Sequence, residues 1–243
     1  MRSRNLYNPS SKKPFKLSRS RLENFIKCAR CFYLDRRLGV EPPSGPPFNL
    51  NIAVDALFKK EFDVYREKKE PHPLMREYGI NAVPYAHPHL NIWRENFKGV
   101  QFLHEPTNLL ITGAIDDVWM NPEGALIIAD YKATSKNGEI TLEDEWKIAY
   151  KRQMEIYQWL FRRNGFKVAN TGYFVYSNGL KDCDDFKDCL RFKTVVLPHE
   201  GNDSWVEKCI LDAHACLTSS AIPNMTDDCG FCKYLRDASS IKG

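Results

Sequence analysis

Two carboxylates and a lysine stand at the ends of two apolar segments in the middle of the chain. The first segment carries Asp116, and the second ends in Asp130-Tyr-Lys132. Because side chains of a strand alternate between its faces, Asp130 and Lys132 are expected on the same face. A lone charge at the end of a buried strand is costly, so such groups pair, bind a cation or do chemistry. Two carboxylates suit a hard divalent cation, and a neighbouring lysine can handle a water molecule or a developing anion.

The apolar residues around these charges predict a β-hairpin. Residues 109–120 and 125–131 are rich in Ile, Leu and Val, and Asn-Pro-Glu-Gly at 121–124 makes a good short turn. Asp116 would then lie on the strand beside the second acid and bring its carboxylate to the same place. Strand alternation turns Asp117 away from Asp116, so we expect it to face solvent or to support the site from behind.

A long helix is predicted after the hairpin. Thr141 with Asp144 can cap a helix that runs to about Arg163. Gln153 and Tyr157 lie four residues apart on it, share a face and have apolar neighbours. Taken alone, the pair is typical of a packed glutamine and tyrosine at the edge of the core. Beside the two acids and the lysine, the pair could instead orient a water molecule or a phosphate next to a metal ion.

The rest of the chain predicts helices before the hairpin and further strands after it. The helices are expected at residues 20–39, 51–66 and 204–217, with a short one near Trp93 among loops at 70–108, and the strands at 172–176 and 190–197. This order indicates a mixed α/β fold in which a small sheet is flanked by helices. We expect residues 17–243 to form a single domain, preceded by a basic, flexible arm at 1–16.

The composition suits a globular protein and limits where it works. Of 243 residues, 43% are apolar and 12% aromatic, and 35 Lys and Arg face 31 Asp and Glu. This mild basic excess does not by itself indicate nucleic-acid binding; the basic arm is typical of a solvated tail, with phosphate contact as the alternative. No apolar stretch approaches the roughly 20 residues that span a bilayer, and the N-terminus lacks the apolar part of a signal peptide. We therefore expect a cytoplasmic protein that contacts no membrane.

Four of the eight cysteines form two C-x-x-C pairs near opposite ends of the chain, Cys28 with Cys31 and Cys229 with Cys232. In the cytoplasm, disulfides are the less favoured interpretation. Four thiolates suit Zn²⁺ or an iron–sulfur cluster. Zinc ribbons place their pairs closer in sequence, so these pairs predict a staple that ties the two ends of the domain together. The other four cysteines have no ligand-like spacing.

Three motifs together resemble those of the PD-(D/E)XK nuclease superfamily: Gly113-Ala-Ile-Asp116, Asp130-Tyr-Lys132 and Gln153-x-x-x-Tyr157. The branch that is most similar is that of the RecB-like exonucleases, which includes CRISPR-associated RecB-like nucleases and the AddB nuclease domain. Residues 18–28 are similar to the cysteine-bearing opening helix of that branch. The resemblance implies a restriction-endonuclease-like core.

The resemblance also implies a metal site. Asp116, Asp130 and the backbone carbonyl of Tyr131 would ligate Mg²⁺ or Mn²⁺. Many relatives add a histidine from the second helix, and Asp55 stands at the matching position here. An aspartate can still ligate Mg²⁺, and a surface-facing helix residue is the alternative. For the cysteines, the resemblance implies a [4Fe–4S] staple, although relatives usually contribute one N-terminal and three C-terminal cysteines; Zn²⁺ is the alternative.

The remaining roles implied by the resemblance concern the reaction. Lys132 would help to activate the attacking water and stabilise charge at phosphorus, and Gln153 and Tyr157 would position Lys132 or the DNA strand. We therefore expect a metal-dependent single-stranded DNA exonuclease that acts in repair, recombination or CRISPR processing, with a helicase or another protein of those pathways as a partner. The alternatives are a catalytically silent nucleic-acid-binding module and a structural protein held by a zinc staple.

Overall fold

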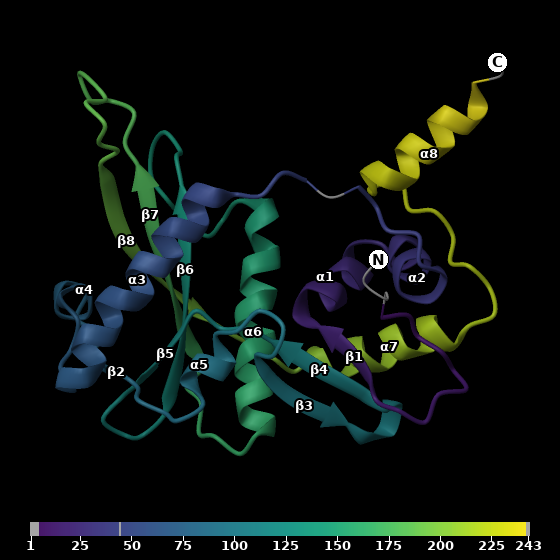
Figure 1. The fold of residues 1–243 in the computed structure, drawn as a ribbon, viewed down its shortest axis with the longest axis horizontal. Helices are drawn as coiled ribbons and strands as arrows, with labels where there is room; N and C mark the ends of the chain where they lie inside the picture. The colour runs from purple at the N-terminus through teal and green to yellow at the C-terminus, as the bar shows by residue number, and fades with distance from the viewer. Residues whose placement is uncertain (1–4, 44, 242–243) are drawn as a thin grey trace. The chain divides into compact units, whose positions relative to one another are not determined.

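The computed structural model describes residues 5–43 and 45–241. The chain divides into two compact units, each built from segments that are separate in sequence. The terminal unit comprises Met1–Pro46, Gln101–Thr112 and Ser204–Gly243, and the central unit comprises Pro47–Val100 and Gly113–Asp203. Runs of helices and runs of strands follow one another along the chain (Figure 1). The mixed α/β class predicted from the sequence is thus confirmed.

The central unit is built on a five-stranded mixed sheet. The strand order is β2-β5-β6-β7-β8, in which β6 and β7 are parallel and the other neighbours are antiparallel. Strands β6 and β7 are therefore joined by a crossover through helix α6. The bounds are β2 Val83–Pro84, β5 Asp117–Met120, β6 Leu126–Thr134, β7 Thr171–Gly179 and β8 Phe192–Glu200, with helices α3 Asn49–Lys68, α4 Pro73–Glu77, α5 Leu90–Trp93, η2 Glu145–Lys147 and α6 Ile148–Arg163.

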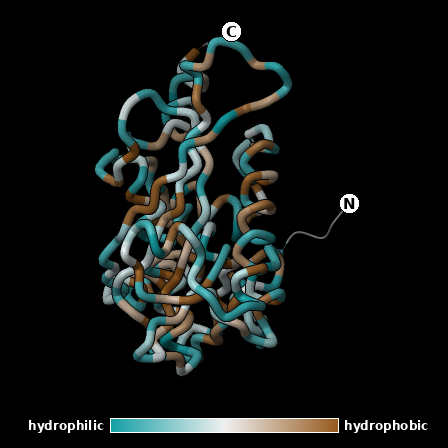
Figure 2. The backbone as a smooth tube through the Cα atoms, turned by 90° about the vertical axis from the view of Figure 1, so that its left-hand side faces the viewer, coloured by the Kyte–Doolittle hydropathy of each residue, from teal (hydrophilic) through white to brown (hydrophobic). Residues whose placement is uncertain are grey.

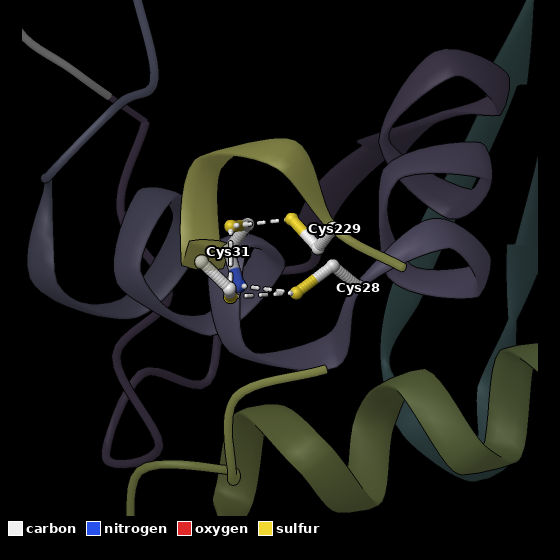
Figure 3. A group of neighbouring side chains, drawn as sticks. Cys28, Cys31 and Cys229 are labelled. Atoms are coloured by element: carbon white, nitrogen blue, oxygen red, sulfur yellow. Dashed lines mark hydrogen bonds between the residues drawn. The ribbon is translucent and has the colours of Figure 1, made fainter. Parts of the chain in front are cut away.

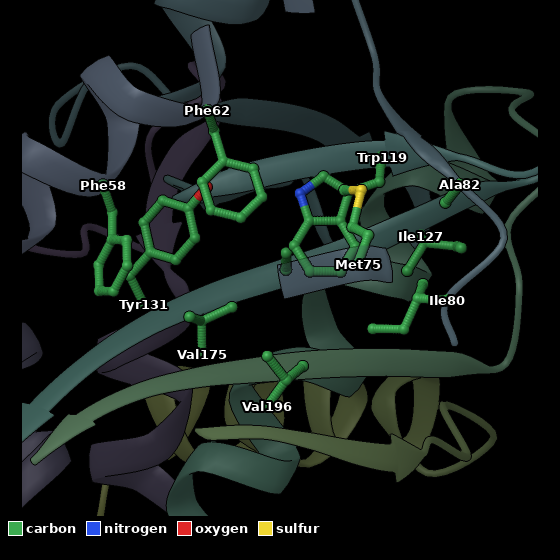
Figure 4. Close-up of a cluster of buried hydrophobic side chains, with 11 residues drawn as sticks. Phe58, Phe62, Met75, Ile80, Ala82, Trp119, Ile127, Tyr131, Val175 and Val196 are labelled. Atoms are coloured by element: carbon green, nitrogen blue, oxygen red, sulfur yellow. The ribbon is translucent and has the colours of Figure 1, made fainter. Parts of the chain in front are cut away.

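Helix α3 covers one face of this sheet with aromatic side chains. Phe58 and Phe62 pack on Tyr131 of β6, with ring centroids 5.1 and 5.4 Å away, and Phe62 stacks on Trp119 of β5 at 5.5 Å (Figure 4). Val175 of β7 lies in the same buried cluster. Because Tyr131 points to this face, its neighbours Asp130 and Lys132 point to the other one, towards α6.

The terminal unit holds a three-stranded sheet with the order β1-β4-β3, in which β1 and β4 are parallel. Helices α1 and α2 both pack against α7. In both units, apolar stretches coincide mostly with strands and helices, whereas the long loops are largely hydrophilic (Figure 2). The bounds are β1 Phe15–Ser18, α1 Arg19–Lys27, α2 Ala29–Leu38, β3 Val100–His104, η1 Glu105–Thr107, β4 Leu109–Gly113, α7 Val206–Thr218 and α8 Gly230–Ser240.

Two predicted elements are divided in the structure. The expected helix at 20–39 breaks at Cys28, whose extended backbone (φ −162°, ψ 104°) ends α1 and starts α2. The expected strand at 109–120 is two strands of different sheets, because β4 pairs with β1 while β5 pairs with β6. The predicted hairpin exists as β5 and β6, but its first strand begins only at Asp117. Asp116 therefore lies in the connection between β4 and β5 instead of within a strand.

One further boundary and one element differ. Helix α6 starts at Ile148, after the 3₁₀ turn η2, and Asp144 stands at the N-cap position of that turn without a capping hydrogen bond from its side chain. Helix α8, which follows the last pair of cysteines, was not predicted. Over residues 5–43 and 45–241, no helix is both long enough and apolar enough to cross a membrane.

Candidate active site and cysteine site

Strand β6 carries the first acid and the lysine of the candidate active site. Asp130 is fully buried, and its carboxylate forms an ion pair with the ammonium group of Lys132, two residues further along the strand. The Nζ atom of Lys132 also lies 4.8 Å from the ring centroid of Tyr150 on α6. The two predicted neighbours are therefore in contact, and an aromatic ring that the sequence did not single out supports the lysine through a cation–π interaction.

Asp116 reaches the same place from the connection that precedes β5. The backbone N–H of Tyr131 donates to Asp116 Oδ2 at 2.9 Å, and the Asp116 carboxylate lies near enough to Asp130 to raise its pKa. The local reason is the antiparallel pairing of β5 with β6, which sets Asp117 opposite Ala129. Asp116, the residue before Asp117, therefore lies beside Asp130, the residue after Ala129. The structure thus brings Asp116, Asp130 and Lys132 together.

Burial and charge act against each other at these groups. Burial, opposed by the Lys132 charge and assisted by the nearby Asp116 carboxylate, raises the pKa of Asp130 to about 7. For Lys132, burial lowers the pKa, but the Asp130 and Asp116 carboxylates outweigh it and hold the pKa above its ordinary value. The lysine is therefore charged at neutral pH, and its charge opposes the rise that burial causes in the pKa of Asp130.

Helix α6 supplies the glutamine and the tyrosine. The Nε2 group of Gln153 donates to Asp130 Oδ1 at 2.7 Å and to the hydroxyl of Tyr157 at 3.1 Å. Both side chains are buried. Gly113 lies against the Tyr157 ring, where a Cβ atom at position 113 would stand only 2.6 Å from Cε1. The glycine of the first motif thus has a packing reason, and Gln153 contacts the acid rather than the lysine.

Helix α3 adds a third carboxylate and a second lysine. Lys59 Nζ lies 2.7 Å from Asp55 Oδ2, one helical turn away, and 3.5 Å from Asp116 Oδ1. Burial and the nearby Asp116 charge raise the pKa of Asp55. Asp55 therefore points towards the other acids, with about a third of its side chain (30%) exposed. Lys59 was missed in the sequence, although its i,i+4 spacing from Asp55 is a recognisable signal.

A buried ionic network supports Asp116 from behind. Asp117 is fully buried, which contradicts the solvent-facing alternative, and its Oδ1 accepts from Arg66 at 2.5 Å and from Arg94 at 2.9 Å. Its Oδ2 accepts from the Tyr131 hydroxyl at 2.6 Å. Arg94 Nε also donates to the backbone carbonyl of Asp116 at 3.0 Å. Neither arginine had a sequence signal, because only the tertiary structure brings them to Asp117.

The carboxylate groups fit a hard divalent cation. Asp55, Asp116 and Asp130 offer oxygen ligands only, which Mg²⁺ and Mn²⁺ prefer. Asp55 Oδ1 is buried and accepts no hydrogen bond from any residue that the structure describes. The ammonium groups of Lys59 and Lys132 now occupy cation positions beside these acids. Among the described residues, the four cysteines are the one group of at least three potential ligand atoms that all lie within 4.8 Å of one another. The three acids are not gathered as closely as that.

The cysteine site joins the two C-x-x-C pairs within the terminal unit (Figure 3). Cys28 and Cys31 stand at the start of α2, whereas Cys229 and Cys232 stand at the start of α8. The Sγ–Sγ distances are 3.6 Å for Cys28–Cys232 and Cys31–Cys229 and 4.0 Å for Cys31–Cys232. The predicted convergence of both chain ends at one group of thiols is therefore present.

This spacing fits a single tetrahedral ion. Zinc–sulfur bonds of about 2.3 Å set the sulfurs about 3.8 Å apart. A four-iron cluster places irons and sulfides between its thiolates, so its cysteines would have to stand farther apart. At Cys28, burial is outweighed by hydrogen bonds from the Thr226 hydroxyl and the Cys31 backbone, which lower the pKa of the thiol to about 7. A thiol that ionises near neutral pH is a better metal ligand.

Comparisons with known proteins give a family match and similar solved structures. The family model of the PD-(D/E)XK nuclease superfamily matches residues 16–236. The chain has no match among curated proteins. A crystal structure of SSO0001 is similar over 88% of this chain and 81% of its own, with 17% identity and a TM-score of 0.35. A crystal structure of LHK-Exo in complex with dAMP is similar over 93% of both chains, with 12% identity and a TM-score of 0.38.

Proposed function

This chain belongs to the PD-(D/E)XK nuclease superfamily, and from that premise we propose that it is a metal-dependent exonuclease that degrades single-stranded DNA. The observation that carries the proposal is the meeting of Asp116, Asp130 and Lys132 in the central unit. The single-stranded substrate and the RecB-like branch rest on the motifs that run from Gly113 to Tyr157. DNA repair, recombination and CRISPR processing are the pathways to which that branch points, with a helicase as a partner to test.

The chain's own groups have distinct tasks in this proposal. Asp116, Asp130 and the Tyr131 carbonyl hold Mg²⁺ or Mn²⁺, and Asp55 adds a further oxygen ligand. When bound, a divalent cation makes hydroxide available at neutral pH and neutralises charge on the phosphate. Lys132 is held by Asp130 and by the ring of Tyr150. It orients the attacking water and faces the charge that develops on phosphorus.

Two buried side chains complete the arrangement. Gln153 fixes the orientation of Asp130 by donating to one of its oxygens, which leaves the other oxygen for a cation or the lysine. Tyr157 accepts from Gln153 and so holds the glutamine in place. Both are positioning residues: they keep the acid in a productive geometry without contacting the phosphate.

The test uses single strands labelled at the 5′ or the 3′ end, with Mg²⁺, with Mn²⁺ and with neither. We expect wild-type protein to release mononucleotides only with a metal, and Lys132→Ala to lose about a thousandfold or more in rate. Lys193→Ala is the matched control, because Lys193 is an exposed lysine of the same sheet on β8. Full activity of Lys132→Ala refutes the site.

The departure at Asp55 favours one second candidate, a nucleic-acid-binding module without cleavage. Many relatives carry a histidine at the position of Asp55, and Asp55 is already paired with Lys59. Wild-type protein that binds single strands but cuts none of them with Mg²⁺ or Mn²⁺ supports this candidate over the nuclease.

For the cysteine site, the sulfur spacing supports Zn²⁺ over a [4Fe–4S] cluster. The metal content and the absorption spectrum of protein purified without oxygen decide between them. A colourless protein with one equivalent of zinc fits the spacing, whereas a brown protein with about four irons requires the thiols to move apart when the cluster binds.

A further inference from the structure

Lys59 of α3 lies between two of the proposed metal ligands. Its Nζ atom is 2.7 Å from Asp55 Oδ2 and 3.5 Å from Asp116 Oδ1. All three side chains are partly shielded from water, with exposed fractions of 21% for Lys59, 30% for Asp55 and 22% for Asp116. An ammonium group thus stands where the proposed function requires a cation.

Charge balance explains why a lysine is stable there. Asp55, Asp116 and Asp130 would repel one another in a partly buried site. Lys132 pairs with Asp130, and Lys59 pairs with the other two acids, so one negative charge is left uncompensated. Although burial lowers the pKa of Lys59, the Asp116 and Asp55 carboxylates raise it above its ordinary value. The site is therefore nearly neutral without any metal.

A metal ion and the Lys59 ammonium compete for the same oxygen atoms. One oxygen of Asp116, Oδ2, is already engaged by the Tyr131 N–H, so Oδ1 is the oxygen that both cations would use. At Asp55, Oδ2 accepts from Lys59 while the buried Oδ1 has no hydrogen-bond partner among the described residues. A divalent ion that takes up both carboxylates must therefore push the ammonium group aside.

The two lysines of the site differ in how firmly they are held. Lys132 is part of strand β6, pairs with a fully buried acid and lies over the Tyr150 ring. Lys59 reaches the site from a helix on a flexible four-carbon stem, and neither of its carboxylate partners is fully buried. Of the two ammonium groups, Lys59 is the one that can swing away without leaving a buried acid unpaired.

We propose that Lys59 is a built-in competitor of the metal: it occupies Asp55 and Asp116 in the metal-free protein, leaves them when a divalent cation binds, and so sets the cation affinity. This inference rests on the proposed function, since it concerns the same metal site. It makes Lys59 a positioning residue that lowers affinity, in contrast to the ligands, which raise it.

The test measures Mn²⁺ affinity without DNA, by titration calorimetry and by the electron paramagnetic resonance signal of free Mn²⁺. Displacing a partly exposed ion pair costs about 1 kcal/mol, so Lys59→Met should lower the Kd for Mn²⁺ about fivefold to tenfold. Lys60→Met is the matched control, because Lys60 is an exposed neighbour on the same helix, and it should bind like wild type. Lys59→Arg keeps the charge and should bind no tighter than wild type.

A second measurement follows the lysine itself. In protein with ¹³C-labelled lysine, the ε-carbon resonance of Lys59, assigned by its loss in Lys59→Arg, should shift as Mg²⁺ saturates the site. The Lys60 resonance should stay in place. This readout uses wild-type protein and therefore holds even where Lys59→Met does not fold.

The outcomes separate this inference from the proposed function. Wild type that binds no Mn²⁺ and cuts no DNA overturns both. Wild type that binds and cuts, with equal or weaker Mn²⁺ binding in Lys59→Met, overturns the competitor alone. A Lys59 resonance that does not move at saturating Mg²⁺ also overturns it, because the ammonium group has then stayed where it was.

Discussion

The carboxylate site of the central unit and the cysteine site of the terminal unit differ in what holds their ligands together. In the carboxylate site, Lys59 and Lys132 neutralise the acids, and Arg94 fixes the backbone of Asp116. In the cysteine site, the free thiols form hydrogen bonds with one another and with the Thr226 hydroxyl. The first site carries its own counter-charges, whereas the second gathers soft, ionisable ligands around one point.

This difference predicts different roles for the metals. A site that is neutralised by its own side chains keeps its fold when the metal leaves, and the metal is needed only for chemistry. A group of thiols that joins distant segments gains stability when a metal closes it, so its metal contributes to folding.

Replacing Asp130 with asparagine should abolish cleavage and leave the fold in place. The amide supplies no anionic ligand, so the rate should fall about a thousandfold or more. The free energy of unfolding should change by no more than about 1–2 kcal/mol, because asparagine still accepts from Gln153 and Asp116 still faces Lys132. Cleavage assays and denaturant titration check both statements. The metal content at the cysteines should stay unaltered. Unfolding of the whole protein in Asp130→Asn would contradict the separation between a carboxylate site for chemistry and a cysteine site for folding.

Replacing Cys232 with serine should have the opposite signature. Cys232 is fully buried, and its loss removes one of four metal ligands. The protein should lose the cysteine-bound metal, and the free energy of unfolding should fall by about 3–5 kcal/mol. Cys183→Ser is the control, because Cys183 is exposed and lies outside the group. Elemental analysis and thermal unfolding give the answer, and equal stability of the two variants would contradict a structural metal.

Asp117→Asn should damage both fold and activity, with a smaller loss of activity than Asp130→Asn and a loss of stability no larger than that of Cys232→Ser. It removes the buried anion between the guanidinium groups of Arg66 and Arg94, which keep only the more exposed Asp63 carboxylate, and this costs about 3 kcal/mol. Arg94 also holds the Asp116 carbonyl, so cleavage should fall about tenfold to a hundredfold. In Asp212→Asn, which breaks an exposed ion pair with Lys208, the stability should change by less than about 1 kcal/mol. Equal effects in the two variants would mean that burial of the network is energetically unimportant.

The smallest effect concerns pH. Burial, only partly offset by Glu61, lowers the pKa of His72, which stacks on Phe62 at a centroid distance of 3.9 Å. The folded protein therefore prefers neutral His72: its contribution is complete above the unfolded pKa of about 6.5 and is lost as the pH falls below that value. Between pH 7.5 and 5.5, wild type should lose more stability than His72→Asn, because the buried imidazole is the group that differs. Denaturant titrations at several pH values measure this, and identical pH profiles would exclude the histidine.

Part of the active site followed from local rules. Strand alternation put Asp130 and Lys132 on one face, and the structure has them in contact. Helical spacing paired Gln153 with Tyr157, and the two share a hydrogen bond. These predictions succeeded because each depends on the geometry of one element. The single nuclease domain expected over residues 17–243 stays a prediction beside the two compact units of the structure.

Other features depended on contacts that no local pattern encodes. Apolar residues at 109–120 suit a strand of either sheet, so the pattern could not show that β4 and β5 separate and leave Asp116 in a connection. Alternation turned Asp117 away from Asp116 correctly, but its burial depends on arginines that come from α3 and from the end of α5. Lys59 had an i,i+4 signal towards Asp55, yet its approach to Asp116 requires α3 to pack on the sheet.

The mixed α/β class, the family motifs and the types of ligand at both sites could be read from the amino-acid order alone, because they depend on residue identity and on spacing within single elements. Which charges neutralise which became known from the folded chain: Lys59 pairs with Asp55 and Asp116, and the arginines pair with Asp117. An ion pair depends on distances of a few ångströms between groups that are far apart in the chain. Those distances exist only after the helices have packed on the sheet.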